Sequence, residues 1–260
     1  MSAKQRKARE TFATSDARFQ IVVTDDGSRT VVCRDDGQSF HSESGAIAEA
    51  KTVYLENSGV LQKFKSKTPV RIFELGFGFG LNFFVAANFA MELKATLEYV
   101  AVENRPVPND VVQQLALDSQ EATKIAWRAW LNAAPNPAAE DESLRERLRS
   151  WEGVSCRICE CDFSEFDRVD IKEFDTIFFD PFSPESNPEL WSEACFDACL
   201  ELLAWGGTLV TYCVKRSVQD ALTNVGFRVE KKRGPQGGKR EVLVATKDAG
   251  REELFSKSID

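Results

Sequence analysis

Between residues 70 and 246, short apolar runs alternate with segments of helical length, and this order constrains the fold more than any other feature. An apolar run of about five or six residues bounded by turn residues is typical of a buried strand. Strands that alternate with helices form a mostly parallel sheet covered on both faces. We therefore expect a Rossmann-like α/β fold with strands at 71–75, 97–102, 154–161, 174–179 and 208–213, helices at 81–91, 189–203 and 218–224, and a closing antiparallel hairpin at 227–231 and 241–246.

Two regions depart from this alternation. Residues 19–23 and 30–33 indicate short strands with Asp-Gly turns, and residues 45–55 have helical character. We expect residues 1–68 to form a small β appendage with a helix that packs on the core, and residues 69–250 to form the main domain. Within that domain, residues 106–150 indicate a mostly helical insertion broken at 135–137.

The composition excludes several classes of protein. No apolar run approaches the ~20 residues of a membrane helix, and the basic segment 1–10 lacks the apolar stretch of a secretory signal. We expect a cytoplasmic protein that binds no membrane, with its seven cysteines reduced. Cys156, Cys159 and Cys161 lie in a predicted strand far in sequence from His41, the only histidine, so we expect no metal site. The sequence indicates no oligomeric state.

A glycine-rich turn joins the first core strand to the first helix, with the sequence Glu74-Leu75-Gly76-Phe77-Gly78-Phe79-Gly80-Leu81-Asn82. Its glycines allow a tight turn and a close approach to a ligand. The dinucleotide fingerprint would require glycine at position 81, which is Leu. The turn, with an acidic residue inside the strand, instead resembles that of class I S-adenosylmethionine (SAM)-dependent methyltransferases. Simple packing of a strand against a helix is the alternative interpretation.

Acidic residues also follow the next strands. Glu103 follows 97–102, where a carboxylate can accept hydrogen bonds from both ribose hydroxyls of a nucleoside. Asp162 follows the third strand, where it can accept from an adenine amino group while Phe163 packs against the ring. Each acid alone could be a helix cap or a surface residue. Because the carboxyl ends of parallel strands meet at one edge, together they predict a site for a nucleoside cofactor.

The fourth strand ends at Asp180, which opens the segment Asp180-Pro181-Phe182-Ser183-Pro184. This segment is similar to the Asp-Pro-Pro-aromatic loop of amino-group methyltransferases. Methyl transfer from a sulfonium to an amine moves positive charge onto nitrogen, which a fixed carboxylate can stabilise and orient. We predict Asp180, Pro181 and Phe182 as catalytic residues. The alternative interpretation is a strand, a turn and a helix cap.

Four separated segments resemble the methyltransferase component of the MnmC/MnmD family, which modifies the wobble uridine of tRNA. The segments are 41–49 with 53–55, 74–83, 180–184 with 187–191, and 237–241, within a resemblance that extends over roughly residues 35–247. The resemblance implies a class I methyltransferase fold, SAM as the cofactor and the tRNA anticodon loop as the partner. The implied reaction converts 5-aminomethyl-(2-thio)uridine to its 5-methylaminomethyl form.

The resemblance and the motifs together assign residue roles. The predicted cofactor contacts are Ser42, Gly45, Glu49, Glu74, Gly76, Gly78, Gly80, Asn82, Glu103, Asp162, Phe163 and Asp180. The predicted substrate contacts are Ser183, Asn187, Trp191, Lys239 and Arg240. Trp191 could instead anchor its helix to the loop. His41 could touch the active site, but we interpret it as a hydrogen-bonded loop histidine and give it no role as a base.

Two features depart from the family. Phe79 replaces the usual threonine, so a hydroxyl near the cofactor is lost and the pocket could be reshaped. Bifunctional members also carry a flavin-dependent oxidase domain, for which 260 residues leave no room. We therefore expect this chain to perform only the final methylation, on an aminomethyl group made by another enzyme.

The charge is unevenly distributed along the chain. The net charge is −8, but residues 215–240 hold eight basic residues against two acidic ones, a local balance of +6. This cluster indicates either a solvated face or a phosphate-binding patch. An aminopropyltransferase of the polyamine type is the alternative enzyme, although a basic patch favours a polyanionic acceptor. A non-catalytic SAM-binding or tRNA-binding module is the other alternative, and it gains weight if Phe79 blocks the cofactor.

Overall fold

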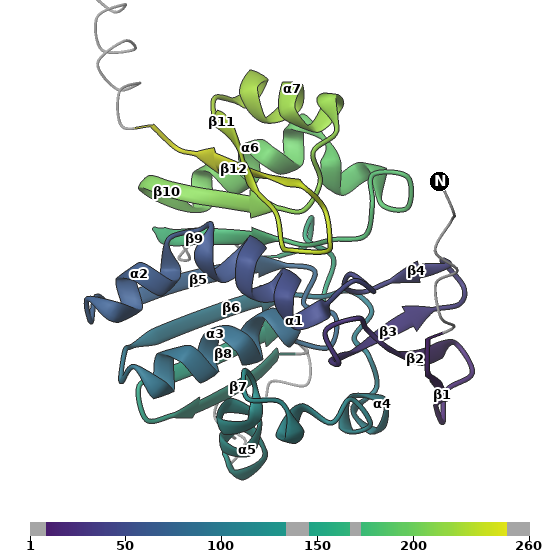
Figure 1. The fold of residues 1–260 in the computed structure, drawn as a ribbon. Coiled ribbons are helices and arrows are strands. Elements are labelled where there is room, and N and C mark those ends of the chain that lie inside the picture. Colours follow the sequence, from purple (N-terminus) through teal and green to yellow (C-terminus); the bar gives the residue numbers. More distant parts are fainter. Residues whose placement is uncertain (1–8, 134–145, 167–172, 249–260) are drawn as a thin grey trace, which may run out of the picture.

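The computed structural model describes residues 9–133, 146–166 and 173–248, and these residues contain a central eight-stranded sheet (Figure 1). The strand order is β11-β12-β10-β9-β5-β6-β8-β7. The five strands from β10 to β8 in this order are parallel, whereas β7, β11 and β12 are antiparallel to their neighbours. The strands are β5 (Val70–Leu75), β6 (Leu97–Val102), β7 (Glu146–Trp151), β8 (Val154–Cys159), β9 (Phe174–Phe179), β10 (Leu203–Thr211), β11 (Arg228–Arg233) and β12 (Glu241–Thr246).

The direction of the strand order changes at β5, whose neighbours are β6 on one side and β9 on the other. In open α/β sheets, ligands bind beyond the carboxyl ends of the strands at such a switch point. The glycine-rich turn follows β5, and Asp180 follows β9. The backbone N–H of Asp180 donates to the carbonyl of Leu75 at 2.9 Å. The topology therefore brings two of the predicted motifs together.

Helices cover both faces of the sheet (Figure 1). One face packs against α2 (Val60–Lys65), α3 (Leu81–Glu92), α4 (Asn109–Gln113), α5 (Lys124–Asn132) and the π-helical segment η1 (Ala50–Glu56). The opposite face packs against α6 (Glu193–Leu202) and α7 (Arg216–Val225). Large side chains such as Phe83 and Phe196 are fully buried in these two layers, and each contributes about 1.5–3 kcal/mol to folding. Shorter helical elements are α1 (Ala46–Glu49), η2 (Leu117–Ser119) and η3 (Pro188–Trp191).

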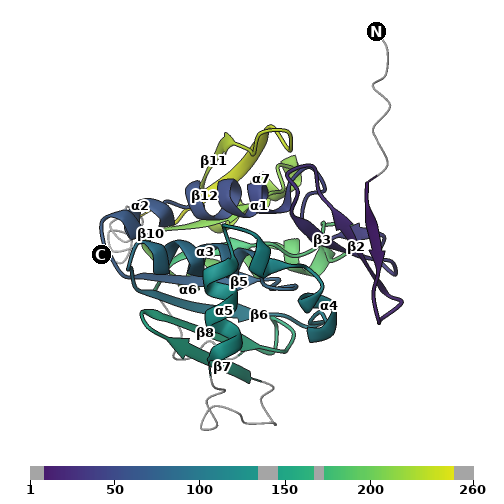
Figure 2. The same ribbon diagram turned by 60° about the horizontal axis from the view of Figure 1, so that its bottom comes forward.

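A second, four-stranded antiparallel sheet lies beside the carboxyl ends of the central strands (Figures 1 and 2). It contains β1 (Thr11–Ala13), β2 (Phe19–Val23), β3 (Arg29–Cys33) and β4 (Gln38–Ser39). The ring of Phe40 meets the edge of the Phe182 ring at 5.0 Å, and Nε2 of Gln38 donates to Oγ of Ser183 at 3.2 Å. The small sheet is therefore in contact with the predicted catalytic loop. The domain boundary at residue 68 stays a prediction.

The predicted α/β fold class and its closing hairpin are confirmed. β8 is shorter than expected because it ends at Cys159, and β10 is longer because it begins at Leu203. The pairing of β10 with β9 shifts register between Leu203 and Thr208, so the strand includes the predicted Trp205-Gly206-Gly207 turn as an irregularity. Gly206 has a φ of 76°, which a glycine adopts without strain.

The prediction of a helical insertion over residues 106–150 was wrong at its C-terminal end. Residues 146–151 form β7, which pairs with β8 at the edge of the sheet. Arg157 binds Glu146 at 2.5 Å, and the guanidinium of Arg149 lies over the Trp130 ring at 4.8 Å. Charged side chains on an edge strand limit pairing with other chains, and they hide the apolar alternation that would have indicated a strand. The predicted break at 135–137 lies outside the described residues.

Two predicted helices are divided. Residues 45–55 form α1 and then η1, because the hydrogen bonding changes to a π-helical pattern at Ala50. Residues 189–203 form η3 and then α6. Ser192 separates them because its backbone is extended, and its hydroxyl accepts a hydrogen bond from the N–H of Cys195 at 3.3 Å as the N-cap of α6.

Neither a membrane helix nor a metal cluster is present in the described residues: no helix there is long and apolar enough to cross a membrane, and no three His, Cys, Asp or Glu side chains are grouped to hold an ion. Cys156 and Cys159 are buried free thiols. Burial raises the pKa of the Cys159 thiol to about 12 and raises that of Cys156 as well, so both stay protonated at neutral pH.

Candidate active site

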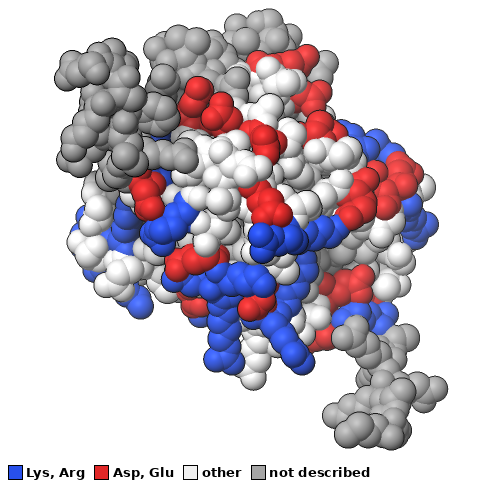
Figure 3. Space-filling model, turned by 90° about the horizontal axis from the view of Figure 1, so that it is seen from above, with Lys and Arg blue, Asp and Glu red and all other residues white. Residues whose placement is uncertain are grey.

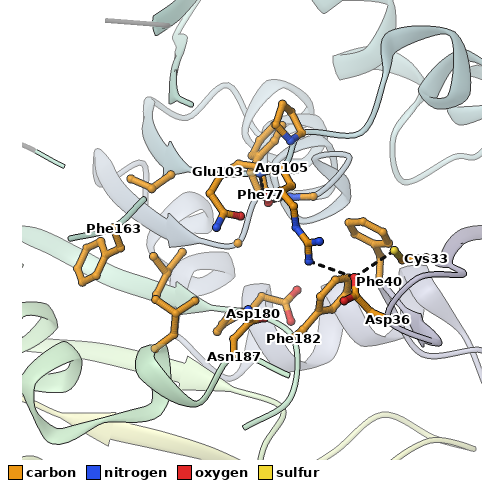
Figure 4. A pocket seen from close by; sticks show the side chains of 18 of the residues that line it. Cys33, Asp36, Phe40, Phe77, Glu103, Arg105, Phe163, Asp180, Phe182 and Asn187 are labelled. Carbon is orange, nitrogen blue, oxygen red and sulfur yellow. Dashed lines mark hydrogen bonds and ion pairs between the residues drawn. The ribbon is translucent and has the colours of Figure 1, made fainter. Parts of the chain in front are cut away.

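A cavity of about 290 Å³ lies at the carboxyl ends of β5, β6, β8 and β9 (Figure 4). Its volume is near the lower end of the ~300–1,000 Å³ that is usual for small-molecule sites. The core lines it with residues 75–78, 102–106, 161–163, 180–182, Asn187 and Leu190. The small sheet and its loops line it with Arg18, Phe19, Cys33, Asp35, Asp36, Phe40 and His41.

The glycine-rich turn approaches two neighbouring segments closely. Gly76 has a φ of 88°, and a Cβ there would lie 2.7 Å from the carbonyl oxygen of Asp180. A Cβ on Gly78 would lie 2.7 Å from Cδ1 of Phe40. Gly80, with a φ of 84°, is the N-cap of α3. The absence of side chains therefore lets the turn pack against both the catalytic loop and the small sheet.

Glu103 is positioned at the end of β6 by two backbone donors. The N–H of Gly78 donates to Oε2 at 2.7 Å, and the N–H of Arg105 donates to Oε1 at 2.8 Å. Burial raises the pKa of Glu103, although both donors oppose this effect. Each carboxylate oxygen can accept a second hydrogen bond, so the side chain keeps acceptor capacity for two hydroxyls at the cavity (Figure 4).

Asp162 and Phe163 follow β8 and also line the cavity. Oδ1 of Asp162 accepts a hydrogen bond from Nδ2 of Asn104 at 3.1 Å, which joins the loops after β6 and β8. Phe163 is buried, with its ring 6.0 Å from that of Phe73. A flat apolar surface therefore lies beside an exposed carboxylate, which suits a heteroaromatic ring with an amino group.

Glu74 and Asn82 form a buried support beneath the turn. Nδ2 of Asn82 donates to Oε1 of Glu74 at 2.8 Å and to Oδ2 of Asp180 at 2.8 Å. The hydroxyl of Tyr99 donates to Oε2 of Glu74 at 2.7 Å. Burial raises the pKa of Glu74 well above its usual value, although both hydrogen bonds oppose this effect. Asn82 therefore joins a buried carboxyl to the predicted catalytic one.

Asp180 is held by one hydrogen bond on each carboxylate oxygen. Oδ1 accepts from the hydroxyl of Tyr54 at 2.5 Å, and Oδ2 accepts from Asn82. Nδ1 of His41 lies 3.8 Å from Oδ2. Burial raises the pKa of Asp180 to about 7, against the opposing effect of His41. The carboxyl group can therefore exchange a proton near neutral pH.

The loop after Asp180 is fixed by its backbone carbonyls. The hydroxyl of Tyr212 donates to the carbonyl of Pro181 at 2.9 Å, and Nε1 of Trp191 donates to the carbonyl of Phe182 at 2.8 Å. Trp191 is buried, and its hydrogen bond to Phe182 anchors η3 to the catalytic loop. Ser183 is held by Gln38, whereas Asn187 lines the cavity.

Ser42 and Gly45 belong to a turn behind the cavity wall, and this turn leads into α1, where Glu49 lies. Oε2 of Glu49 accepts a hydrogen bond from the N–H of Ser42 at 2.7 Å and lies 3.7 Å from Nδ1 of His41. Gly45 has a φ of 147° and leaves room for the side chain of Asp26. The turn therefore positions His41, which lines the cavity itself.

Lys239 and Arg240 lie in the loop between β11 and β12. The ammonium of Lys239 lies 3.9 Å from the centre of the Tyr212 ring. Burial lowers the pKa of Lys239, although Glu49 and Asp180 oppose this effect. Arg240 is exposed. Basic and acidic side chains are mixed on the face of the molecule seen in Figure 3. Within the basic cluster, Lys231 is paired with Glu241, and Lys232 with Glu230.

Some of the predicted site residues line the cavity, whereas others are not part of its lining. Among the described residues, the lining includes Gly76, Gly78, Glu103, Asp162, Phe163, Asp180, Pro181, Phe182 and Asn187. Within the same part of the chain, it does not include Ser42, Gly45, Glu49, Glu74, Gly80, Asn82, Ser183, Trp191, Lys239 or Arg240.

Several residues at the site were not predicted. Arg105 crosses from the β6 side to Asp36 of the small sheet, with Nη2 3.1 Å from Oδ2 (Figure 4). The only signal for Tyr54 was its place in one of the resembling segments. The contribution of the small sheet had no signal, because pairing between distant segments leaves no local pattern.

Phe79, the departure from the family pattern, is 2% exposed. Its ring packs against Phe40 at 6.1 Å and against His41 at 5.3 Å. It is not among the described residues that line the cavity, so its ring does not fill the space beside Gly76 and Glu103.

Comparison with known proteins gives a consistent assignment. A family profile described as an S-adenosyl-L-methionine-dependent methyltransferase matches residues 120–248. The bifunctional MnmC proteins for tRNA 5-methylaminomethyl-2-thiouridine biosynthesis from Polaromonas naphthalenivorans and Delftia acidovorans are 30% and 32% identical over 209 and 202 residues. Each match covers 75% of this chain but 30% of the relative, so the chain spans about a third of their length.

The crystal structure of MnmC2 from Aquifex aeolicus has the same fold. It superposes with a TM-score of 0.70 and 23% identity, and the match covers 99% of this chain and 77% of that one. The sequence relatives, the family profile and the fold agree with the cavity built from Gly76, Glu103, Asp162 and Asp180. The chain therefore belongs to the S-adenosyl-L-methionine-dependent methyltransferases of the MnmC type.

Proposed function

We propose that this chain methylates the amino group of 5-aminomethyl-(2-thio)uridine at the wobble position of tRNA. The names of its relatives support the product, 5-methylaminomethyl-2-thiouridine, and the family supports the methyl donor. The observation that carries the proposal is Asp180, a side chain only 6% exposed, which is held by Tyr54 and Asn82 at a cavity of nucleoside type.

The residues of the cavity fit SAM. Glu103 keeps acceptor capacity for two ribose hydroxyls, and Asp162 lies beside Phe163 where an adenine ring would pack. Gly76 and Gly78 leave space where any Cβ would contact Asp180 or Phe40. When bound, SAM supplies a methyl group on a sulfonium, which an amine lone pair displaces while the electrons of the carbon–sulfur bond return to sulfur.

Asp180 would prepare the acceptor amine. An alkylammonium such as that of lysine has a pKa of about 10.4, so at neutral pH it must lose a proton before its lone pair can react. With a pKa of about 7, Asp180 is substantially ionised at neutral pH and can accept that proton. Its two hydrogen bonds fix the direction in which the carboxylate accepts that proton.

The tRNA would approach over the loop between β11 and β12. Lys239 lies against the ring of Tyr212, and the hydroxyl of Tyr212 donates to the carbonyl of Pro181. A tRNA phosphate bound by Lys239 would therefore lie close to the catalytic loop. Cationic side chains near the acceptor disfavour a polyamine substrate. We further propose that the anticodon loop is the part bound, that another enzyme makes the aminomethyl group, and that the chain works in the cytoplasm, where it would meet tRNA.

The proposal is tested with labelled SAM and tRNA from cells that lack this methylation, followed by mass spectrometry of the nucleosides. We expect methylaminomethyluridine to appear and aminomethyluridine to disappear. Asp180→Ala should reduce turnover about 10²–10³-fold while SAM binding is largely retained. Asp197→Ala, at an exposed carboxylate on α6, is the control and should keep full activity. Persistence of aminomethyluridine with the unaltered protein would contradict the proposal.

A further inference from the structure

His41 occupies an unusual position between two carboxylates. Its side chain is 5% exposed, and its Nδ1 lies 3.7 Å from Oε2 of Glu49 and 3.8 Å from Oδ2 of Asp180. Both distances exceed those of hydrogen bonds, and Nδ1 has no hydrogen-bond partner among the described residues. A buried nitrogen without a hydrogen bond is unfavourable unless charge stabilises it, and two facing carboxylates can stabilise a positive charge.

The surrounding structure fixes this position. The backbone N–H of His41 donates to Oγ1 of Thr30 at 3.1 Å, and its carbonyl accepts from Oγ of Ser39 at 2.6 Å. The ring meets Phe79 edge to face at 5.3 Å. The small sheet and the ring of Phe79 therefore hold the imidazole beside Asp180.

Asp180 has several other charged or titratable neighbours. They are Glu49 from α1, Tyr54 from η1, Glu74 from β5, Tyr99 from β6, Tyr212 just after β10 and Lys239 from the hairpin loop. Glu49 raises the pKa of Asp180, whereas Tyr54 and Asn82 lower it through hydrogen bonds. In the described part of the chain, His41 is the basic residue within ion-pair distance of both Glu49 and Asp180.

We propose that His41 is a positioning residue for the methyl transfer, whose imidazolium keeps the carboxyl group of Asp180 ionised. The inference rests on the proposed function, because it assumes an ammonium acceptor at Asp180. One proton passes from the acceptor nitrogen to an oxygen of Asp180, and the electron pair of that N–H bond becomes the reactive lone pair. His41 keeps its own proton throughout. Burial lowers the pKa of His41, but Glu49 and Asp180 more than reverse this effect, which agrees with the charged form.

The first test is a pH–rate profile of His41→Gln with tRNA and SAM. A positive charge beside a carboxyl lowers its pKa, so the loss of that charge should move the acid limb of kcat/KM upward by about one pH unit. At pH 6 the variant should be about tenfold slower than the unaltered protein, and near pH 9 the two rates should converge. An unshifted acid limb would overturn the proposal, because a merely structural role lowers the rate equally at every pH.

The second test needs no turnover. Because His41 is the only histidine, 15N-histidine labelling of the full chain reports one imidazole, whose NMR titration gives its pKa and its protonated nitrogens directly. We expect a pKa above 6.5, lowered by about one unit in Asp180→Asn and in Glu49→Gln. Coupling between two sites is reciprocal, so the shift caused by Asp180→Asn equals the effect of the imidazolium on Asp180.

Glu43→Gln is the matched control. Glu43 lies two residues from His41, but its carboxylate pairs with Arg9, so this substitution should leave the His41 titration unchanged. An imidazole that titrates at or below pH 6.5, or that does not respond to Asp180→Asn, overturns the proposal. If the unaltered protein methylates no tRNA while the titration shows the coupling, the proposed function fails and the charge pairing of His41 with Asp180 stands.

Discussion

Tyr54 donates a hydrogen bond of 2.5 Å from its hydroxyl to Oδ1 of Asp180, which joins η1 to the loop after β9. Both side chains are buried where they meet, and π-helical turns such as η1 often occur at functional sites. The hydrogen bond stabilises the ionised form of Asp180, in addition to the contribution of His41. The orientation of the Asp180 carboxyl group and its affinity for a proton therefore depend on η1, which precedes the central sheet in sequence.

The rate of methylation should depend on pH in a way that identifies the proton acceptor. If Asp180 takes the proton from the acceptor ammonium, kcat/KM rises as pH increases through about 7, because Asp180 then becomes ionised. It should then be level until the ammonium itself loses its proton near pH 10. The profile is measured with saturating SAM. A tenfold rise per pH unit that continues from pH 7 to pH 10 would show that free neutral amine is the substrate instead.

Tyr54→Phe should weaken catalysis without weakening cofactor binding. It removes a hydrogen bond to a charged group, so we expect kcat to fall about tenfold. The pKa of Asp180 should rise, because the lost hydrogen bond favoured the ionised form, and the acid limb of the rate profile should move upward with it. The dissociation constant of SAM should not change in a calorimetric titration.

Tyr99→Phe is the matched control for this prediction. It removes a buried hydrogen bond from a tyrosine to a carboxyl, but the carboxyl belongs to Glu74. We expect a loss of stability of about 1 kcal/mol and an unshifted acid limb. Equal shifts in the two variants would mean that the hydrogen bond of Tyr54 has no specific effect on Asp180.

Gly76→Ala should disrupt the site through its backbone. A left-handed φ of 88° strains any other residue by about 1 kcal/mol, and the new Cβ would also lie 2.7 Å from the carbonyl oxygen of Asp180. Gly59, the N-cap of α2, has a similar φ of 84° but nothing within 4 Å of its Cβ position. Gly59→Ala should therefore lose about 1 kcal/mol of unfolding free energy and bind SAM normally.

Gly76→Ala should lose more unfolding free energy than Gly59→Ala and should bind SAM poorly, because the turn must move away from the catalytic loop. Denaturant unfolding and SAM titration of both variants measure the difference. Equal stability and equal SAM affinity of the two variants would show that the close approach at Gly76 is not required.

The core of the fold and the position of the site were predictable because they depend on local patterns. The glycine-rich turn follows β5, Glu103 follows β6 and Asp180 follows β9. Ligands of open α/β sheets bind beyond the carboxyl ends of the strands at the switch point, so these positions were enough to predict a shared site. Asp162 was found in the same way, although β8 ends at Cys159, three residues before it. Because these strands are parallel, the residues that follow their carboxyl ends lie at the same edge of the sheet.

The remainder of the site depends on contacts that sequence spacing does not show. Nothing local indicates that Phe40 packs on Phe182, or that Arg105 reaches Asp36, because these pairs join segments far apart in the chain. We interpreted His41 as a hydrogen-bonded loop histidine, and the sequence does not show the two carboxylates that face it, because they come from α1 and from the residue after β9. β7 was missed because its charged residues follow no alternation.

Glu103→Gln should weaken SAM binding selectively. The amide keeps the shape of the side chain and one acceptor for Gly78, but it loses the negative charge and half of the acceptor capacity toward the cavity. We expect the dissociation constant of SAM to rise about tenfold, since one hydrogen bond to a charged group is lost. Glu98→Gln, at a carboxylate on β6 that is paired with Arg71, should leave SAM affinity unchanged. Calorimetry at pH 7.5 compares the two variants, and an equal affinity would remove Glu103 from the cofactor site.

Lys239→Ala should weaken tRNA binding without changing SAM binding. Its ammonium lies over the ring of Tyr212, close to the catalytic loop, where it can contact a phosphate of the anticodon loop. The loss of one phosphate contact should raise KM for tRNA and reduce the slope of log affinity against log salt by about one. Lys232→Ala is the control, because Lys232 lies on β11 and is paired with Glu230. Filter binding at several salt concentrations gives both slopes. If Lys232→Ala reduces the slope as much as Lys239→Ala, the basic cluster attracts tRNA as a whole and Lys239 has no particular place in the complex.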